Sequence, residues 1–136
     1  MDQHEFQRRT KALAIDAITM TGSLTPGRAV DIIARQLLRS ATSVGANYRA
    51  ACRARSPQEM FAKLSIVEEE ADECLYWLEI LDESHLAPSS AVQPLRGSAS
   101  EILAMVVASK RTLRRRITVN RESAIGNRQS QVTRES

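Results

Sequence analysis

Residues 36–81, QLLRSATSVGANYRAACRARSPQEMFAKLSIVEEEADECLYWLEIL, contain two stretches with the apolar periodicity of a helix, separated by one signal for the start of a helix. Ser56-Pro57-Gln58-Glu59 has the form of a capping box. In this motif the serine hydroxyl accepts from a free backbone N–H of the first turn, and the glutamate carboxylate accepts from the backbone N–H of the serine. On both sides of it, apolar residues recur at alternating spacings of four and three, which is typical of packed helices. This stretch therefore predicts two long antiparallel helices joined by a short turn.

The same periodicity extends outward to two further segments, so we expect helices over about residues 2–21, 26–55, 57–85 and 94–116. Thr25-Pro26 resembles a helix start, and Pro94 suits the first turn of the last helix. The fold class is therefore predicted to be all-α, an antiparallel up-down-up-down four-helix bundle spanning residues 1–117. Residues 118–136 are polar and aperiodic, which indicates a disordered C-terminal tail. The four stripes consist of Phe6, Leu13, Ala17 and Met20; Val30, Ala34, Leu37, Ala41, Val44, Tyr48 and Ala51; Met60, Leu64, Val67, Ala71, Cys74, Leu78 and Leu81; and Leu95, Ala99, Ile102, Val106, Ser109 and Leu113.

The composition fits one globular domain, because 43% of the 136 residues are hydrophobic and 26% are charged. The N-terminus has no apolar signal core, and no uncharged apolar run reaches the roughly 18 residues of a membrane span. In a hairpin turning near residue 55, Cys52 and Cys74 would lie roughly 20 Å apart, too far for a disulfide. Two reduced thiols predict a cytoplasmic protein without membrane contact.

Charge is distributed unevenly along the chain. Residues 25–55 carry six arginines and one aspartate, residues 56–85 one lysine and nine acidic residues, and residues 101–136 eight basic and three acidic residues. Such segregation indicates ion pairs between neighbouring helices. Hairpin geometry places Arg39 near the acidic part of the third helix, so we expect it to pair, within one chain or across a subunit boundary, with Glu69, Asp72 or Glu73.

A second set of apolar residues lies off the main stripes. On the third helix it consists of Ile66, Tyr76, Trp77 and Ile80, and further members are Ile15, Ile18, Ile33, Leu38, Leu103 and Val107. Two interpretations stay open at this point. The set either widens the core stripe of each helix or forms an oligomer interface, where Trp and Tyr are favoured.

Two groups of arginines suggest a nucleic-acid-binding surface. In an up-down-up-down bundle the second and fourth helices point their C-termini to the same end, so both groups gather there. Basic residues also suit helix C-termini through the helix dipole, which is the alternative explanation. This end lacks stacking aromatics, so binding to RNA or DNA would be driven by phosphates and weakened by salt. The residues are Arg49, Arg53, Arg55, Arg111, Arg114, Arg115 and Arg116.

The sequence carries no pattern of an enzyme, and we predict neither catalytic residues, nor a metal, nor a cofactor. Di-iron bundles need Glu-x-x-His pairs, and neither His4 nor His85 belongs to one. Cys74 falls on a core stripe, where an inert buried thiol is usual. There is also no glycine-rich phosphate loop and no nucleophile elbow.

Residues 36–81 resemble the bacterial four-helix-bundle proteins encoded in intervening sequences of 23S ribosomal RNA genes. The resemblance implies a ring, usually a pentamer, and kinship with accessory proteins of diversity-generating retroelements, which are thought to bind nucleic acid and a reverse transcriptase. It implies no catalytic residues. The chain departs from the family pattern at Asn47-Tyr48-Arg49-Ala50-Ala51, and at Glu69 and Glu70. The matching residues are Gln36, Leu37, Arg39, Ser40, Ala41, Ser43, Val44, Asn47, Leu64, Ile66 and Glu73.

Together these patterns predict a non-enzymatic homo-oligomeric bundle that binds RNA or DNA through basic helix ends. The alternative is a protein-interaction subunit, whose partner docks on the ring without nucleic-acid contact.

Overall fold

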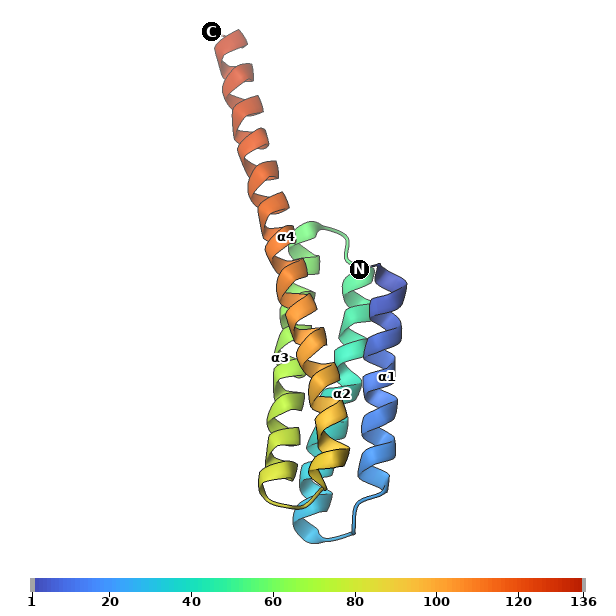
Figure 1. The fold of residues 1–136 in the computed structure, drawn as a ribbon. Helices are drawn as coiled ribbons and strands as arrows, with labels where there is room; N and C mark the ends of the chain where they lie inside the picture. The colour runs from blue at the N-terminus through green and yellow to red at the C-terminus, as the bar shows by residue number, and fades with distance from the viewer. Residues whose placement is uncertain (1, 136) are drawn as a thin grey trace.

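A computed structural model describes residues 2–135 as four α-helices: α1 (Gln3–Gly22), α2 (Arg28–Cys52), α3 (Pro57–Glu83) and α4 (Ser89–Glu135). Each helix packs against its neighbour in sequence, and α4 closes the bundle against α1, with the smallest contact of the four (Figure 1). Within the described residues, the backbones of the diagonal helix pairs do not approach as closely as those of neighbouring helices. The predicted antiparallel up-down-up-down bundle is thus confirmed.

The core consists of the four predicted apolar stripes. All but three of their residues are buried; Ala34 and Met60 are half-buried, and Ser109 is exposed. The core also contains four buried residues that the stripes did not include, namely Thr10, Ser40, Ala87 and Val92. The two hydroxyls donate to carbonyls in their own helices, Thr10 to Gln7 and Ser40 to Leu37, so neither is buried without a partner.

The helix starts follow the capping signals in part. Ser56 Oγ accepts from the Glu59 N–H at 3.1 Å, as predicted for α3, but the Glu59 carboxylate accepts from the Arg55 N–H at 3.3 Å and does not close the box on Ser56. The predicted start of α2 at Thr25-Pro26 was wrong. Gly27 has an extended backbone, with φ 179° and ψ 162°, so α2 begins only at the next residue.

The start of α4 also differs from the prediction. The Ala91 and Val92 N–H groups both bond to the Pro88 carbonyl, so α4 begins at Ser89 and Pro94 lies inside it. Proline inside a helix removes one backbone bond. Its side chain is exposed here, where water can solvate the freed carbonyl. The earlier start places Val92 in the core as an additional turn of packing.

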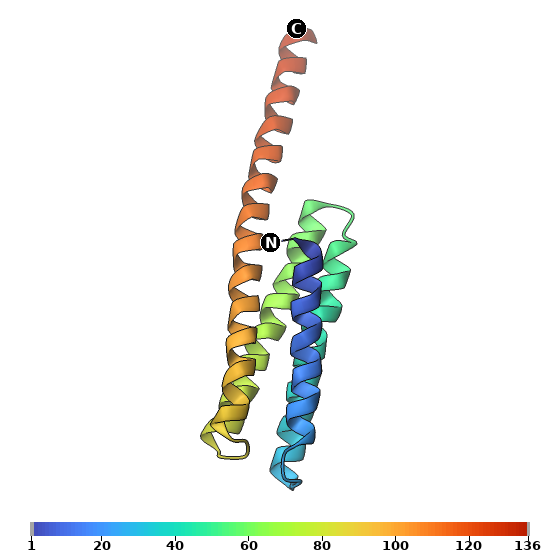
Figure 2. The same cartoon turned by 45° about the vertical axis from the view of Figure 1, so that its right-hand side comes forward.

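The predicted end of the last helix near Arg116 was wrong, because α4 continues to Glu135. Residues 118–135, which the sequence predicts as a disordered tail, project beyond the bundle as a single helix (Figures 1 and 2). Ile117 is half-buried, and every side chain from residue 118 to 134 is exposed. We call residues 118–135 the extension. Its polar composition removes core packing, while its few breakers still permit helical backbone.

The turn from α3 to α4 is a Schellman motif, in which two backbone bonds satisfy the last carbonyls of the helix. The Leu86 N–H donates to the Leu81 carbonyl at 3.0 Å, and the His85 N–H donates to the Asp82 carbonyl at 3.1 Å. His85 therefore has a φ of 60°, in the left-handed region that favours glycine.

Replacing His85 with glycine should raise the free energy of unfolding by about 1 kcal/mol, because glycine adopts the left-handed conformation without the Cβ clash. Urea denaturation followed by circular dichroism measures the change. Ser84 provides the matched control, since its φ of −84° is right-handed. Ser84→Gly should lower stability, and equal effects of the two glycine substitutions would contradict this account.

Candidate nucleic-acid interface

The two predicted arginine groups lie at the same end of the bundle, where the extension leaves it (Figure 1). Arg49 is in the last turn of α2, Arg53 and Arg55 lie in the turn before α3, and the other four lie on α4. All seven side chains are exposed. Within residues 2–135, none of them forms an ion pair. Their positive charges are therefore uncompensated by local carboxylates.

These arginines occupy different faces of that end. Arg49 lines a groove between α1 and α2, whereas Arg116 lines one bordered by all four helices. Arg111 and Arg114 lie on the α3–α4 side. The structure thus arranges positive charge around the end of the bundle, and does not gather all seven residues into one compact patch.

The groove between α1 and α2 adds basic residues that the sequence analysis did not single out. Arg8, Lys11 and His4 line it together with Arg49, and its volume is about 430 Å³. The three α1 residues follow one another at spacings of four and three, so they share a face of the helix. That spacing was visible in the sequence, but which face of α1 meets α2 was not.

Close approach of the two helices forms the floor of this groove. A Cβ built on Gly45 would lie 3.2 Å from Thr10 Oγ1, tighter than ordinary van der Waals contact. Gly45 therefore lets α1 and α2 approach while leaving a shallow channel above their contact. The channel combines small residues at its floor with exposed cations at its rim, a shape and charge that suit a phosphate backbone.

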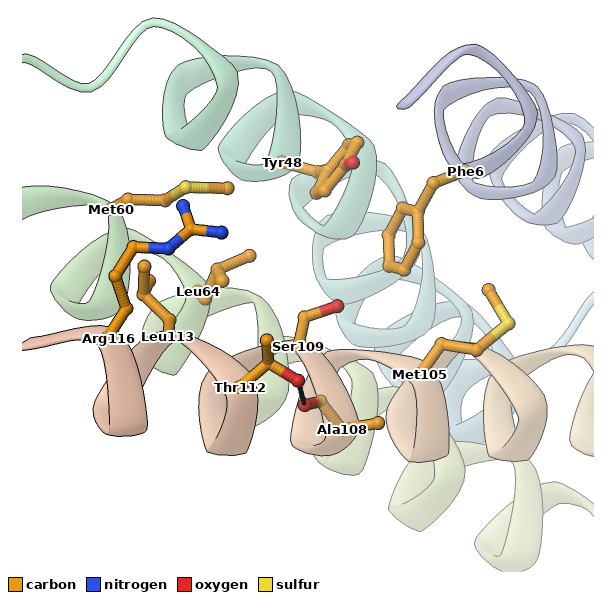
Figure 3. A pocket seen from close by; sticks show the side chains of 10 residues that line it. All are labelled: Phe6, Tyr48, Met60, Leu64, Met105, Ala108, Ser109, Thr112, Leu113 and Arg116. Carbon is orange, nitrogen blue, oxygen red and sulfur yellow. Dashed lines mark hydrogen bonds between the residues drawn. The ribbon is translucent and has the colours of Figure 1, made fainter. Parts of the chain in front are cut away.

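The groove bordered by Arg116 is lined mainly by apolar and aromatic side chains (Figure 3). Its volume is about 460 Å³. Phe6 and Tyr48 stack within it, with ring centroids 4.0 Å apart. Burial, reinforced by Cys52, raises the pKa of the Tyr48 phenol, so the ring stays neutral. The residues that line it are Phe6, Tyr48, Met60, Leu64, Met105, Ala108, Ser109, Thr112, Leu113 and Arg116.

On the α3–α4 side, Phe61 is covered by cations. Lys110 Nζ lies 4.9 Å from the ring centroid and the Arg114 guanidinium carbon 5.1 Å, distances typical of cation–π contacts. Lys110 also pairs with Glu68 at 2.6 Å. Phe61 therefore orients Arg114 while its guanidinium remains exposed.

The ion pairs on α3 show which acidic residues are compensated. Arg39 pairs within the chain with Glu73 and, at 3.4 Å, with Glu70. The predicted pairing of Arg39 with Glu69, Asp72 or Glu73 is confirmed at Glu73, and Glu70 is an additional partner that the prediction did not include. Glu69 and Asp72 are exposed on the outer side of α3, because one helical residue is a rotation of about 100°.

Glu73 also accepts a bond from Trp77 Nε1 at 3.2 Å. The bond from Arg39, and secondly that from Trp77, hold the pKa of the Glu73 carboxyl below its ordinary value. Towards the far end of α3, Arg96 pairs with Glu79 at 3.6 Å and with Asp82 at 3.9 Å. Glu70, Glu73, Glu79 and Asp82 of α3 therefore form ion pairs with arginines of the same chain.

The four residues predicted as an oligomer interface divide into two kinds. Ile66 is 38% exposed and Tyr76 is 54% exposed, so both lie at the surface of α3. Trp77 is half-buried and packs against the core, and Ile80 is half-buried. The wider-stripe interpretation therefore fits Trp77, while Ile66 and Tyr76 lie on the outer surface.

The structure also places the two cysteines and the side chains that could bind a metal ion. Cys52 and Cys74 are both free, and burial raises the pKa of the Cys74 thiol to about 12. In residues 2–135 no group of three or more His, Cys, Asp or Glu side chains is arranged to hold a metal ion. No helix in this part of the chain is long and apolar enough to cross a membrane.

These features define a class of protein, an up-down four-helix bundle with uncompensated arginines around one end. The sequence pattern of the 23S rRNA-intervening sequence protein family matches residues 2–108, and the chain belongs to this family. Its fold is similar to a crystal structure of a protein with unknown function from the S23 ribosomal protein family of Bacteroides thetaiotaomicron. The TM-score is 0.75 at 26% identity, covering 82% of this chain and 99% of that chain. No curated protein matches the chain in sequence.

Glu73→Gln should lower the free energy of unfolding near neutral pH, and the loss should shrink as the pH falls. The folded-state pKa of Glu73 is depressed from 4.5. Its contribution is therefore present above the unfolded-state pKa and lost as the pH falls through the folded-state value. Urea denaturation at about pH 7 and about pH 3 measures both losses.

A double-mutant cycle identifies the partner. Arg39→Ala should couple to Glu73→Gln and should be additive with Asp72→Asn, which removes a carboxylate one residue away on the exposed side. Coupling of equal size to both carboxylates would show that the pair is not specific.

Proposed function

We propose that this protein is a non-enzymatic, cytoplasmic homo-oligomer that binds the phosphate backbone of RNA or DNA at the basic end of its bundle. The observation that carries the proposal is the set of seven exposed arginines, none with an ion-pair partner in residues 2–135, beside a groove rimmed by Arg8, Lys11 and Arg49. Phosphate groups are the ligands that such a surface suits in both charge and shape.

The available side chains favour backbone contact over base reading. The aromatic residues at this end are Phe6, Tyr48 and Phe61. The first two are stacked on each other and buried, and the third is covered by cations. Base stacking needs an open aromatic face. Binding should therefore depend on charge and tolerate any sequence.

Self-association would strengthen such binding, because each added copy presents another basic end to the same polyanion. The family resemblance implies a ring, usually of five chains. The exposed side chains of Ile66 and Tyr76 support a contact surface on α3. The same observation favours the second candidate function, in which a protein partner docks on this surface and no nucleic acid is bound.

Salt and arginine substitutions test nucleic-acid binding. The triple variant Arg114→Ala, Arg115→Ala and Arg116→Ala should weaken binding of a short mixed-sequence single-stranded RNA. It should also reduce the slope of log affinity against log salt by about 0.7 for each phosphate that the variant no longer binds. The groove pair Lys11→Ala and Arg49→Ala should act in the same direction. Fluorescence anisotropy at several salt concentrations measures both effects.

Arg28→Ala with Arg35→Ala is the matched control for the groove pair. Both arginines are exposed and lie in the first half of α2, towards the opposite end of the bundle. This control should leave affinity within about twofold. An equal loss in both pairs would indicate nonspecific charge attraction, and no binding at low salt would favour the protein-interaction alternative.

A further inference from the structure

The extension has one face of neutral amide side chains. Asn120, Ala124, Asn127 and Gln131 follow one another at spacings of four, three and four residues, so they share an arc of about 60° at about 100° per residue. We call these four residues the amide face, and all four side chains are exposed. Within residues 2–135 the three amides form no hydrogen bond, whereas the Ser130 hydroxyl donates to a carbonyl of the preceding turn. The amide donors and acceptors are therefore available to a ligand.

Arginines flank the amide face on both sides. Arg121 and Arg128 lie about 80° to one side of its centre, and Arg134 lies about 50° to the other side. All three are exposed and, within residues 2–135, have no ion-pair partner. Glu122 is the one acidic residue of the segment 118–134, and it lies about 170° from the centre of the face. The surface is thus neutral in the middle and positive at both edges, with the carboxylate on the far side of the helix.

We propose that the extension enters the major groove of duplex DNA. The amide face would point towards the base edges, where Asn and Gln side chains form paired hydrogen bonds with adenine and Ala contacts the thymine methyl group. The flanking arginines would then meet the phosphates of the two strands, which form the walls of the groove. The inference rests on the proposed nucleic-acid binding, and it names the nucleic acid and the element that recognises it.

The shape of the extension fits this groove. Every side chain from residue 118 to 134 is exposed, so the projecting helix is accessible from all sides (Figures 1 and 2). An α-helix with its side chains is about 10–12 Å across, and the major groove of B-form DNA is about 12 Å wide. The major groove of an RNA duplex is deep and narrow, so side chains cannot read it. The dimensions therefore favour duplex DNA over duplex RNA.

The base of the extension joins this surface to the basic end of the bundle. Thr118 and Arg121 border a hollow with Gln58 and Phe61 of α3, and Arg114 lines the same hollow. A duplex that holds the extension in its groove would therefore bring its phosphates to the arginines of the basic end. Helices that continue from a helical bundle or a coiled coil into the major groove are a known mode of DNA binding.

Helix stability gives a second reason for a ligand along the extension. An isolated helix of this length is marginal in water, and Gly126 weakens it further. Contacts with the walls and floor of a groove would supply the packing that the bundle does not provide. The extension also lies beyond residues 2–108, the part of the chain that matches the family, so the family gives it no role.

The affinities of the full-length chain for three probes test the inference. The probes are a short mixed-sequence duplex DNA, the duplex RNA of the same sequence and the single-stranded RNA described above, each followed by fluorescence anisotropy. The wild type should bind duplex DNA at least about tenfold more tightly than duplex RNA, because only the DNA groove admits the helix. Arg128→Ala with Arg134→Ala should weaken duplex DNA binding about tenfold and leave single-stranded RNA binding within about twofold.

Gln131→Ala and Gln129→Ala are a matched pair of variants. The two changes remove the same amide from exposed positions two residues apart, but the positions lie about 160° apart around the helix. Their probe is a duplex DNA that the wild type selects from a random-sequence pool, which should enrich adenine within the site. Gln131→Ala should weaken binding of this duplex at least about fivefold, whereas Gln129→Ala should stay within about twofold.

Three results would overturn entry into the groove while leaving phosphate binding at the basic end intact. They are equal wild-type affinities for the two duplexes, a selected pool without sequence enrichment, and equal losses in the two glutamine variants. A wild type that binds none of the probes at low salt overturns both proposals. Because the substituted side chains lie outside the core, circular dichroism of each variant should show an unchanged thermal transition of the bundle.

Discussion

The packing of α2 against α3 is the constraint on which the rest of the structure depends. Their stripes repeat at alternating spacings of four and three, so each helix presents a continuous apolar edge to the other over its whole length. The Ser56 cap determines where α3 begins and so sets the register of the hairpin. With that register established, α1 and α4 cover the remaining apolar surface, and the helix C-termini of α2 and α4 point the same way.

The same packing decides which charges are compensated. Adjacent residues of α3 point about 100° apart, so one carboxylate can face α2 while its neighbour faces solvent. Glu70 and Glu73 therefore pair with Arg39, whereas Glu69 and Asp72 do not. The pairs on α3 involve arginine or lysine from α2 and α4. Among the described residues, the seven arginines of the basic end have no ion-pair partner, and neither do Arg28 and Arg35 in the first half of α2.

The sequence was sufficient for the four helices, their order and nearly all core residues, because periodicity of apolar residues is a local property. The sequence did not predict the features that depend on contacts between helices. The α1–α2 groove depends on the close approach of Gly45 to Thr10, which no local pattern encodes. Asp72 was a plausible partner of Arg39 only because hairpin register ignores helical phase. Low periodicity beyond residue 117 predicted disorder, although it excludes core packing and not helical backbone.

The two parts of α4 differ in their contacts with the bundle. Up to Ile117, α4 contributes buried and half-buried side chains to the core, whereas the side chains of residues 118–134 are exposed. Thr118 and Arg121 still border a hollow with Gln58 and Phe61 of α3. The seven arginines proposed for phosphate binding all lie before residue 117, so the packing of the bundle determines where they are placed. If α4 stopped at residue 117, the core and the seven arginines of the basic end would remain, because the last buried residue of α4 is Leu113 and the last of these arginines is Arg116.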